Sequence, residues 1–203
     1  PLPLFPSGAR IYLMSYDPRR HHRRSIRLAG WDYRTSAAYF VTICTHQRDC
    51  LFLDPTWCAI AETSWQKIPE TAARVVLDEW IVMPNHVHGI LILTEIAGAP
   101  VTPFNGHHGL PRPEDGPRSL ANAPAGSLGA IIRSYKAAVT RRINHLCHTR
   151  GHKRWQRGYH ERIVRDQREL ERIRTYIRQN PSRWAEDHEN LGSLLERMVF
   201  HDS

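Results

Sequence analysis

Two histidines flank a single valine in MPNHVHGILIL, residues 83–93, between a proline-containing turn and an apolar run. Residues two apart on a strand point to the same face, about 6 to 7 Å apart along the chain. His86 and His88 can therefore converge on one divalent cation, while Val87 faces the core. Closed zinc sites take four protein ligands, so two imidazoles favour an open site with positions left for phosphate oxygens. The alternative is a packing role for both histidines.

A tyrosine and an asparagine lie four residues apart in YIRQN, residues 176–180. Residues at this spacing share one face of a helix, so Tyr176 and Asn180 present a phenol and an amide on one patch. Apolar residues at helical spacing precede them and place Tyr176 on the flank of a buried stripe, where it can lie near both the core and the site. The alternative is a half-buried packing tyrosine.

Hydrophobic periodicity predicts the elements that position these residues. Strand-forming residues predict strands at 37–46, 75–83, 86–93 and 159–164. Helical spacing predicts helices at 55–73, 127–146 and 166–180, the last with Asp166 as N-cap, Glu169 three residues on, and Pro181 after its end. The order is strand, helix, strand, strand, helix, strand and a further helix that carries Tyr176. This order predicts an α+β fold, a ferredoxin-like βαββαβ sandwich with an additional C-terminal helix.

The length of 203 residues suffices for one domain with a core, a loop insertion and tails. Met14 begins a segment that reads as a natural start, which makes the residues before it an expected upstream extension. The predicted segments are an extension at 1–13, a basic N-terminal segment at 14–36, a single domain at 37–184 with a loop insertion at 96–126, and a C-terminal tail at 185–203.

Composition narrows the class of protein. A net charge of +8 together with 41% hydrophobic residues indicates a folded basic protein with polyanionic partners. No apolar run approaches the roughly 20 residues of a membrane helix, and no signal-peptide pattern opens the chain, so a cytoplasmic location without a membrane partner is expected. The four cysteines form no Cys-x-x-Cys pair, which argues against a zinc knuckle and a redox motif.

Taken together, these motifs resemble the HUH single-tyrosine transposases, and the closer match is to their REP-associated branch. The resemblance runs from His21 to Pro181 and is carried, in order, by HHRRSIRLAGWDY, YFVTICTHQRDCLF, WIVMPNHVHGILIL, SLGAIIRSYKAAVTRRIN, WQRGYHERIVRD and YIRQNP. It implies a ferredoxin-like HUH palm and a divalent metal, Mg²⁺ or Mn²⁺. The residues it assigns are the metal ligands His86, His88 and Asn180 and the nucleophile Tyr176. Better-studied relatives carry Gln at the last ligand position, so Gln179 is the alternative to Asn180.

The implied reaction is cleavage and joining of single-stranded DNA. A phenol with a pKa of about 10 is a weak nucleophile at neutral pH, and a cation that polarises the scissile phosphate helps its attack. The expected product is a 5′-phosphotyrosine with a free 3′-hydroxyl, which another 3′-hydroxyl can displace without ATP. Two alternatives remain: a non-catalytic binder of DNA or RNA hairpins, and a metal-dependent phosphodiesterase that uses water. Tyr159 is the rival nucleophile.

Two basic segments are candidates for binding the phosphate backbone. They are PRRHHRRSIR, residues 18–27, and the polar face of the helix at 127–146, although a solvated tail is the alternative for the first. The candidate DNA-binding residues are Arg19, Arg20, Arg23, Arg24, Arg27, Arg133, Lys136 and Arg141. The resemblance implies single-stranded or hairpin DNA with REP-like palindromes as the partner. A nucleoid-associated location is expected for such a protein, and the sequence leaves the oligomeric state open between a monomer and a homodimer.

Overall fold

The structure is a computed structural model that describes residues 31–95 and 123–184. The predicted extension at 1–13, the arginines at 19–27, most of the insertion at 96–126 and the tail at 185–203 lie outside the described residues. The strands are β1 (Ala37–Cys44), β2 (Val75–Met83), β3 (His86–Leu93) and β4 (His160–Ile163). The α-helices are α1 (Pro55–Gln66), α2 (Ile68–Thr71), α3 (Leu128–Leu146) and α4 (Gln167–Gln179). The 3₁₀ turns are η1 (His46–Arg48), η2 (Leu51–Leu53) and η4 (Asn180–Arg183).

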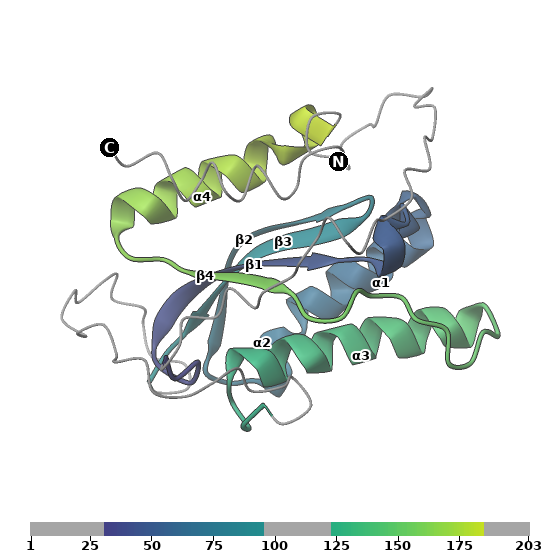
Figure 1. Cartoon of the computed structure of the whole chain (residues 1–203), viewed down its shortest axis with the longest axis horizontal. Helices are drawn as coiled ribbons and strands as arrows, with labels where there is room; N and C mark the ends of the chain where they lie inside the picture. The colour runs from purple at the N-terminus through teal and green to yellow at the C-terminus, as the bar shows by residue number, and fades with distance from the viewer. Residues whose placement is uncertain (1–30, 96–122, 185–203) are drawn as a thin grey trace, which may run out of the picture.

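The four strands form one antiparallel sheet in the order β2-β3-β1-β4. A two-residue turn at Pro84 and Asn85 joins β2 to β3, and each of the two crossover connections carries a helix, as Figure 1 shows. Two βαβ units interleaved in this way give the ferredoxin-like arrangement. The predicted α+β fold with an additional C-terminal helix is therefore confirmed.

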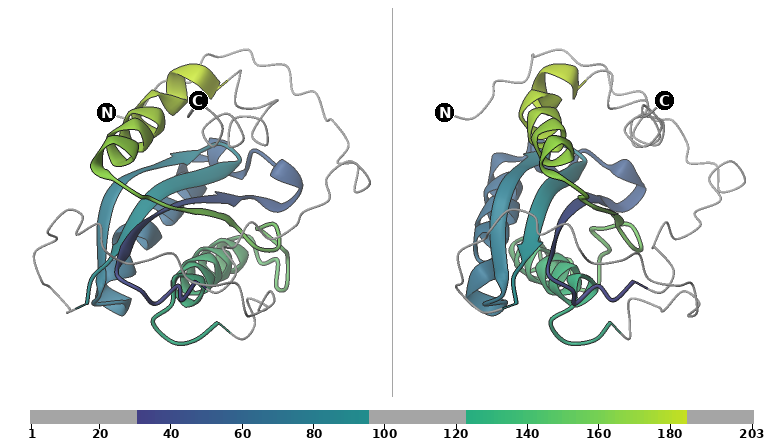
Figure 2. Two further views of the ribbon diagram at one scale, coloured as in Figure 1. Left: turned by 60° about the vertical axis from the view of Figure 1, so that its left-hand side comes forward. Right: turned by 90° about the vertical axis from the view of Figure 1, so that its left-hand side faces the viewer.

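Helices cover both faces of the sheet. Helices α1 and α3 pack on one face and α4 lies on the other, as the views in Figures 1 and 2 agree. Side chains alternate along β3, so Val87 and Leu91 enter the core under α1 and α3, whereas Ile90 joins the smaller cluster under α4. The same alternation directs His86 and His88 to the α4 face.

A glycine in β3 permits the closest packing between the sheet and α1. A β-carbon at Gly89 would lie 2.2 Å from Cζ2 of Trp65, whose ring is fully buried. Opposite Gly89, β2 has an irregularity in register between Leu77 and Trp80. The glycine is thus required by the approach of a ring and not by its own backbone conformation.

The elements differ from the sequence-based expectations at their ends. The predicted helix at 55–73 is two helices: α1 ends at Gln66 and α2 begins at Ile68, because the ring of Pro69 cannot continue α1. Helix α4 begins as predicted, with the Asp166 side chain accepting from Glu169 N at 2.7 Å. None of the helices in the described ranges is long and apolar enough to cross a membrane.

Candidate active site

The two histidines, His86 and His88, lie side by side on the α4 face of β3. Both are fully buried, and their ring centroids are 4.4 Å apart. Each Nδ1 atom has a hydrogen-bonding neighbour: Asn85 Oδ1 lies 2.7 Å from Nδ1 of His86, and Thr42 Oγ1 lies 2.9 Å from Nδ1 of His88. An amide oxygen accepts, so Nδ1 of His86 carries the proton and its Nε2 keeps a lone pair. Neighbours of this kind typically orient metal-binding histidines.

Helix α4 brings Tyr176 to His88 across the top of the sheet. The Tyr176 hydroxyl lies 3.2 Å from His88 Nε2, and the two ring centroids are 5.2 Å apart. Phe40 of β1 stacks on His88 at 5.5 Å and meets Tyr176 edge-on at 6.2 Å. The phenol is therefore held by a hydrogen bond on one side and by ring packing on the other.

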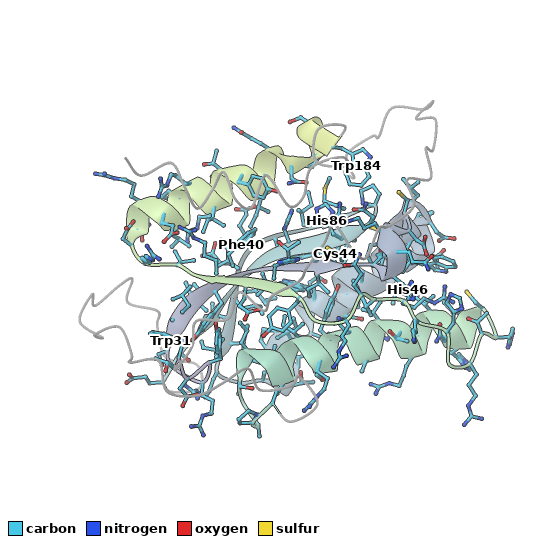
Figure 3. The ribbon with its side chains drawn as sticks, viewed as in Figure 1. Trp31, Phe40, Cys44, His46, His86 and Trp184 are labelled. Carbon is cyan, nitrogen blue, oxygen red and sulfur yellow. The ribbon has the colours of Figure 1, made fainter. Side chains whose placement is uncertain are left out.

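The segment after α4 continues over the histidines. Trp184 stacks on His86 with centroids 6.0 Å apart, and Figure 3 shows both rings on the same side of the sheet. Along the chain, Asn180 lies between Tyr176, which contacts His88, and Trp184, which contacts His86. Asn180 itself is 1% exposed. Within the described residues, neither Oδ1 nor Nδ2 of Asn180 has a hydrogen-bond partner.

This donor set fits a divalent cation. A buried amide without a partner costs about 1 to 3 kcal/mol, and a cation bound to its oxygen would offset that cost. Burial, the neighbouring charge of His88 and that of Arg48 together hold the pKa of His86 well below its usual value, so its imidazole is in the neutral, ligating form. No group of three His, Cys, Asp or Glu side chains that could bind a metal occurs in the described ranges. A metal site here therefore depends on the amide.

The hydrogen bond of Tyr176 restricts how His88 can act. A neutral imidazole has one lone pair, and if Nδ1 donates to Thr42, that lone pair is on Nε2. Nε2 of His88 can then either accept a hydrogen bond from the phenol or bind a metal, but it cannot do both at once. Metal binding at His88 would accordingly release the hydroxyl of Tyr176 from its present partner.

Ion pairs fasten α4 to β2 beside the site. Arg174 donates from Nε and Nη2 to the carboxylate of Asp78 at 2.8 and 2.5 Å, and Arg178 pairs with Glu79 at 3.0 Å. Burial alone raises the pKa of Asp78, but hydrogen bonds from Arg174 and from the Glu79 backbone outweigh it and hold that pKa below its ordinary value. The helix that carries Tyr176 is thus bonded to the strand next to the histidines.

The structure does not bring all of the predicted residues together. Arg133 and Arg141 are exposed on α3, which lies on the sheet face opposite Tyr176. Lys136 is half-buried, and its Nζ donates to the carbonyls of Gln156 and Gly158 at 2.7 and 2.8 Å, which joins α3 to the segment before β4.

The structure also distinguishes between the alternative nucleophiles and between the alternative amide ligands. Tyr159 packs against the core under α1 and α3 and not under α4, so the rival tyrosine lies away from the histidines. Asn180 is buried whereas Gln179 is exposed, which favours the asparagine as the amide ligand. Sequence reasoning missed Thr42 and Trp184, because strand register and the course of the chain after α4 have no local signature.

No protein-family model matches the chain. A solved REP-associated tyrosine transposase bound to a REP hairpin aligns with a TM-score of 0.52 and 16% identity, over 79% of this chain and 74% of that one. A candidate transposase from Deinococcus radiodurans R1 aligns at 18% identity, over 71% of this chain and 91% of that one, with a TM-score of 0.39, too low to establish a shared fold. The chain has the fold of a REP-associated tyrosine transposase, as the resemblance predicts.

The family of the chain is shown by a sequence relative. An uncharacterized protein of Haemophilus influenzae is 33% identical over 184 residues, which are 85% of this chain and 95% of that protein. The chain belongs to the same family as this Haemophilus influenzae protein.

Proposed function

We propose that the chain is a transposase that nicks and joins single-stranded DNA at REP-type hairpins through a 5′-phosphotyrosine on Tyr176. The observation that carries the proposal is the 3.2 Å approach of the Tyr176 hydroxyl to His88 Nε2, beside a second buried histidine. The amide of Asn180, one helical turn after the tyrosine, is buried without a hydrogen-bond partner among the described residues and is the candidate third ligand. The fold shared with a REP-associated tyrosine transposase bound to a REP hairpin supports the substrate class.

The chemistry follows from these atoms. The Tyr176 oxygen attacks the scissile phosphorus, the bond from phosphorus to the 3′ oxygen breaks, and the 3′-hydroxyl leaves with a proton while the phenol gives up its own. Without a metal, His88 Nε2 accepts from the phenol hydroxyl and holds it beside the two imidazoles. A metal bound at that nitrogen would free the hydroxyl of Tyr176 for attack. A divalent ion bound by His86, His88 and Asn180 would supply positive charge to the phosphate oxygens.

Strand joining needs no further machinery. The phosphotyrosine retains the energy of a phosphodiester, so an incoming 3′-hydroxyl can attack the same phosphorus and release Tyr176. Phe40 and Trp184 pack against the rings of the site and limit the access of water to its buried side. A covalent intermediate held in this way favours transfer to DNA over hydrolysis.

The test is a search for the covalent adduct. Wild-type protein with Mn²⁺ or Mg²⁺ and a 3′-labelled REP-type hairpin should give a denaturation-resistant adduct that carries the 3′ fragment and maps by peptide mass to Tyr176. Tyr176→Phe should give no adduct and should change the free energy of unfolding by only about 1 kcal/mol. Tyr159→Phe, which alters the tyrosine on the other side of the sheet, should behave as wild type and serves as the control.

Other outcomes of this test would support one of the two alternative functions. Cleavage by a well-folded Tyr176→Phe variant would indicate a metal-dependent phosphodiesterase that uses water. Hairpin binding without any cleavage, whatever the metal, would indicate a non-catalytic binder. His86→Ala distinguishes the site from the binding surface, because it should abolish cleavage and leave hairpin affinity within about threefold, the metal acting on the phosphate and not on the rest of the DNA.

A further inference from the structure

The turn that follows β1 has an unfavourable backbone conformation. In η1, Gln47 has φ 53° and Arg48 has φ 60°, both in the left-handed region that side chains with a β-carbon disfavour. Two such residues in succession persist only where the surrounding structure imposes them, and such positions gather at functional sites. The turn is therefore a candidate for a functional role.

Hydrogen bonds hold this turn beside His86. Thr45 N donates to Asn85 O at 2.9 Å, and the Thr45 hydroxyl lies 2.9 Å from the same oxygen and 2.7 Å from Asp49 O. Arg48 N donates back to Thr45 O at 3.2 Å. The side chain of Asn85 in turn accepts from His86, so the turn is bonded to the residue that orients the histidine.

The turn carries the positive charge of Arg48 near enough to His86 to act on it. The Arg48 side chain is half-buried, and its charge acts on His86, adding to burial and to His88 in lowering the pKa of that residue. Its guanidinium makes no ion pair or hydrogen bond with any residue of 31–95 or 123–184. A cation beside a pair of metal ligands is unfavourable unless an anion lies between the two positive charges.

A phosphodiester is an anion suited to that position. Guanidinium groups bind phosphate oxygens through paired, charge-assisted hydrogen bonds, and a half-buried one does so with little competition from water. We propose that Arg48 contacts the scissile phosphate beside the two histidines and stabilises the charge that develops on it as Tyr176 attacks. This inference rests on the proposed function, since it needs a phosphate at that place.

The test removes the charge without disturbing the turn. Arg48→Asn keeps a residue that tolerates the left-handed conformation, so the melting temperature should not fall. Adduct formation at saturating hairpin and Mn²⁺ should fall roughly 10²-fold, the usual effect of removing one stabilising donor. Mn²⁺ affinity measured without DNA should stay the same or rise up to about threefold, because a nearby positive charge is gone.

Gln47→Asn is the matched control. It changes the neighbouring residue of the same turn, also at positive φ, and carries no charge, so cleavage, Mn²⁺ affinity and melting temperature should stay within about twofold or a few degrees of wild type. Full cleavage by Arg48→Asn would overturn the assignment of Arg48 and leave the proposed function intact. Weaker Mn²⁺ binding by that variant would also overturn it, because Arg48 would then support the metal site. A wild-type chain that cleaves no hairpin overturns both proposals.

Discussion

Asn180 is a buried polar residue whose amide forms no hydrogen bond within the described residues. It is 1% exposed. The preceding Gln179 is exposed, since consecutive helical residues point about 100° apart. A buried polar group without a hydrogen bond destabilises the folded state. A cation bound to the amide oxygen would offset that cost, and this is the reason for proposing Asn180 as a ligand.

Replacement of Asn180 by leucine should separate stability from metal binding. Asn180→Leu keeps a similar volume and removes the buried amide, so the free energy of unfolding should stay the same or rise by about 1 kcal/mol. Mn²⁺ affinity should fall about tenfold or more, since an oxygen ligand is removed. Denaturant unfolding and Mn²⁺ titration measure the two effects.

The matched control is the neighbouring amide. Gln179→Leu, at an exposed position, should leave Mn²⁺ affinity unchanged. A loss of affinity in this variant together with normal binding by Asn180→Leu would make Gln179 the ligand. A wild-type Mn²⁺ affinity in both variants would show that neither amide is a metal ligand.

At the scale of elements, the packing of β3 on α1 determines where the histidines lie. Gly89 immediately follows His88 and lies under the ring of Trp65. The strand is thereby pressed against α1 on one face while it presents the two histidines to α4 on the other. Any change that lifts β3 from α1 also moves the site.

A methyl group at position 89 should therefore disturb both faces. Gly89→Ala places a β-carbon where Trp65 Cζ2 would be 2.2 Å away, and overpacking of this kind costs roughly 1 to 3 kcal/mol of unfolding free energy. Urea denaturation measures the loss. In a Trp65→Leu background the same change should cost less by about 1 kcal/mol, because the clashing ring is absent. An equal cost in both backgrounds would attribute the effect to backbone preference.

The pairing of α4 with β2 makes part of the stability depend on pH. The folded-state pKa of Asp78 is lowered from 3.8, so its contribution is fully present above the unfolded pKa and is lost as pH falls through the lower folded value. Asp78→Asn should therefore lower the free energy of unfolding at pH 7 by about 1 to 2 kcal/mol. The difference from wild type should shrink below pH 3.8.

Denaturant unfolding at several pH values checks this sign. Glu79→Gln is the control, because its pair with Arg178 is more exposed and such surface pairs contribute about 0 to 1 kcal/mol. A difference between Asp78→Asn and wild type that persists unchanged at low pH would show that the ion pair with Arg174 is not its source.

At the scale of the whole molecule, the sheet separates the basic helix α3 from the face that carries Tyr176. Arg133 and Arg141 on α3 lie on the face opposite Tyr176, and DNA that reaches the tyrosine does not contact them unless it passes around an edge of the sheet. The basic segment at 14–36 lies largely outside the described residues, and its contact with DNA stays a prediction.

Salt dependence distinguishes the contributions of α3 and of the basic segment. Deletion of residues 14–27 should weaken hairpin binding and flatten the dependence of log affinity on log salt by about 0.7 for each phosphate that the segment neutralises. Deletion of residues 1–13 should change neither. The double variant Arg133→Gln, Arg141→Gln should leave adduct formation at saturating hairpin unchanged, since neither residue lies near Tyr176. An unchanged salt slope after the longer deletion would exclude the segment from the interface.

Local periodicity alone determined much of this protein. The alternation of a strand places His86 and His88 on one face, and the turn of a helix places Asn180 one turn from Tyr176, whatever surrounds them. Connection rules allow only a few topologies for a given order of strands and helices, and the order in this chain leads to the ferredoxin-like sheet. These inferences hold because they depend on residues no more than a few positions apart, or on the order of elements along the chain.

Only the tertiary structure decided which residues from distant segments of the chain contact one another. The hydrogen bond between Tyr176 and His88 joins residues 88 apart, and Thr42 reaches the same histidine through the register of β1 on β3. The placement of α3 on the far face of the sheet and of Arg48 beside His86 has no local signature either. Such distances result from the packing of side chains between segments, and that packing depends on the whole chain at once.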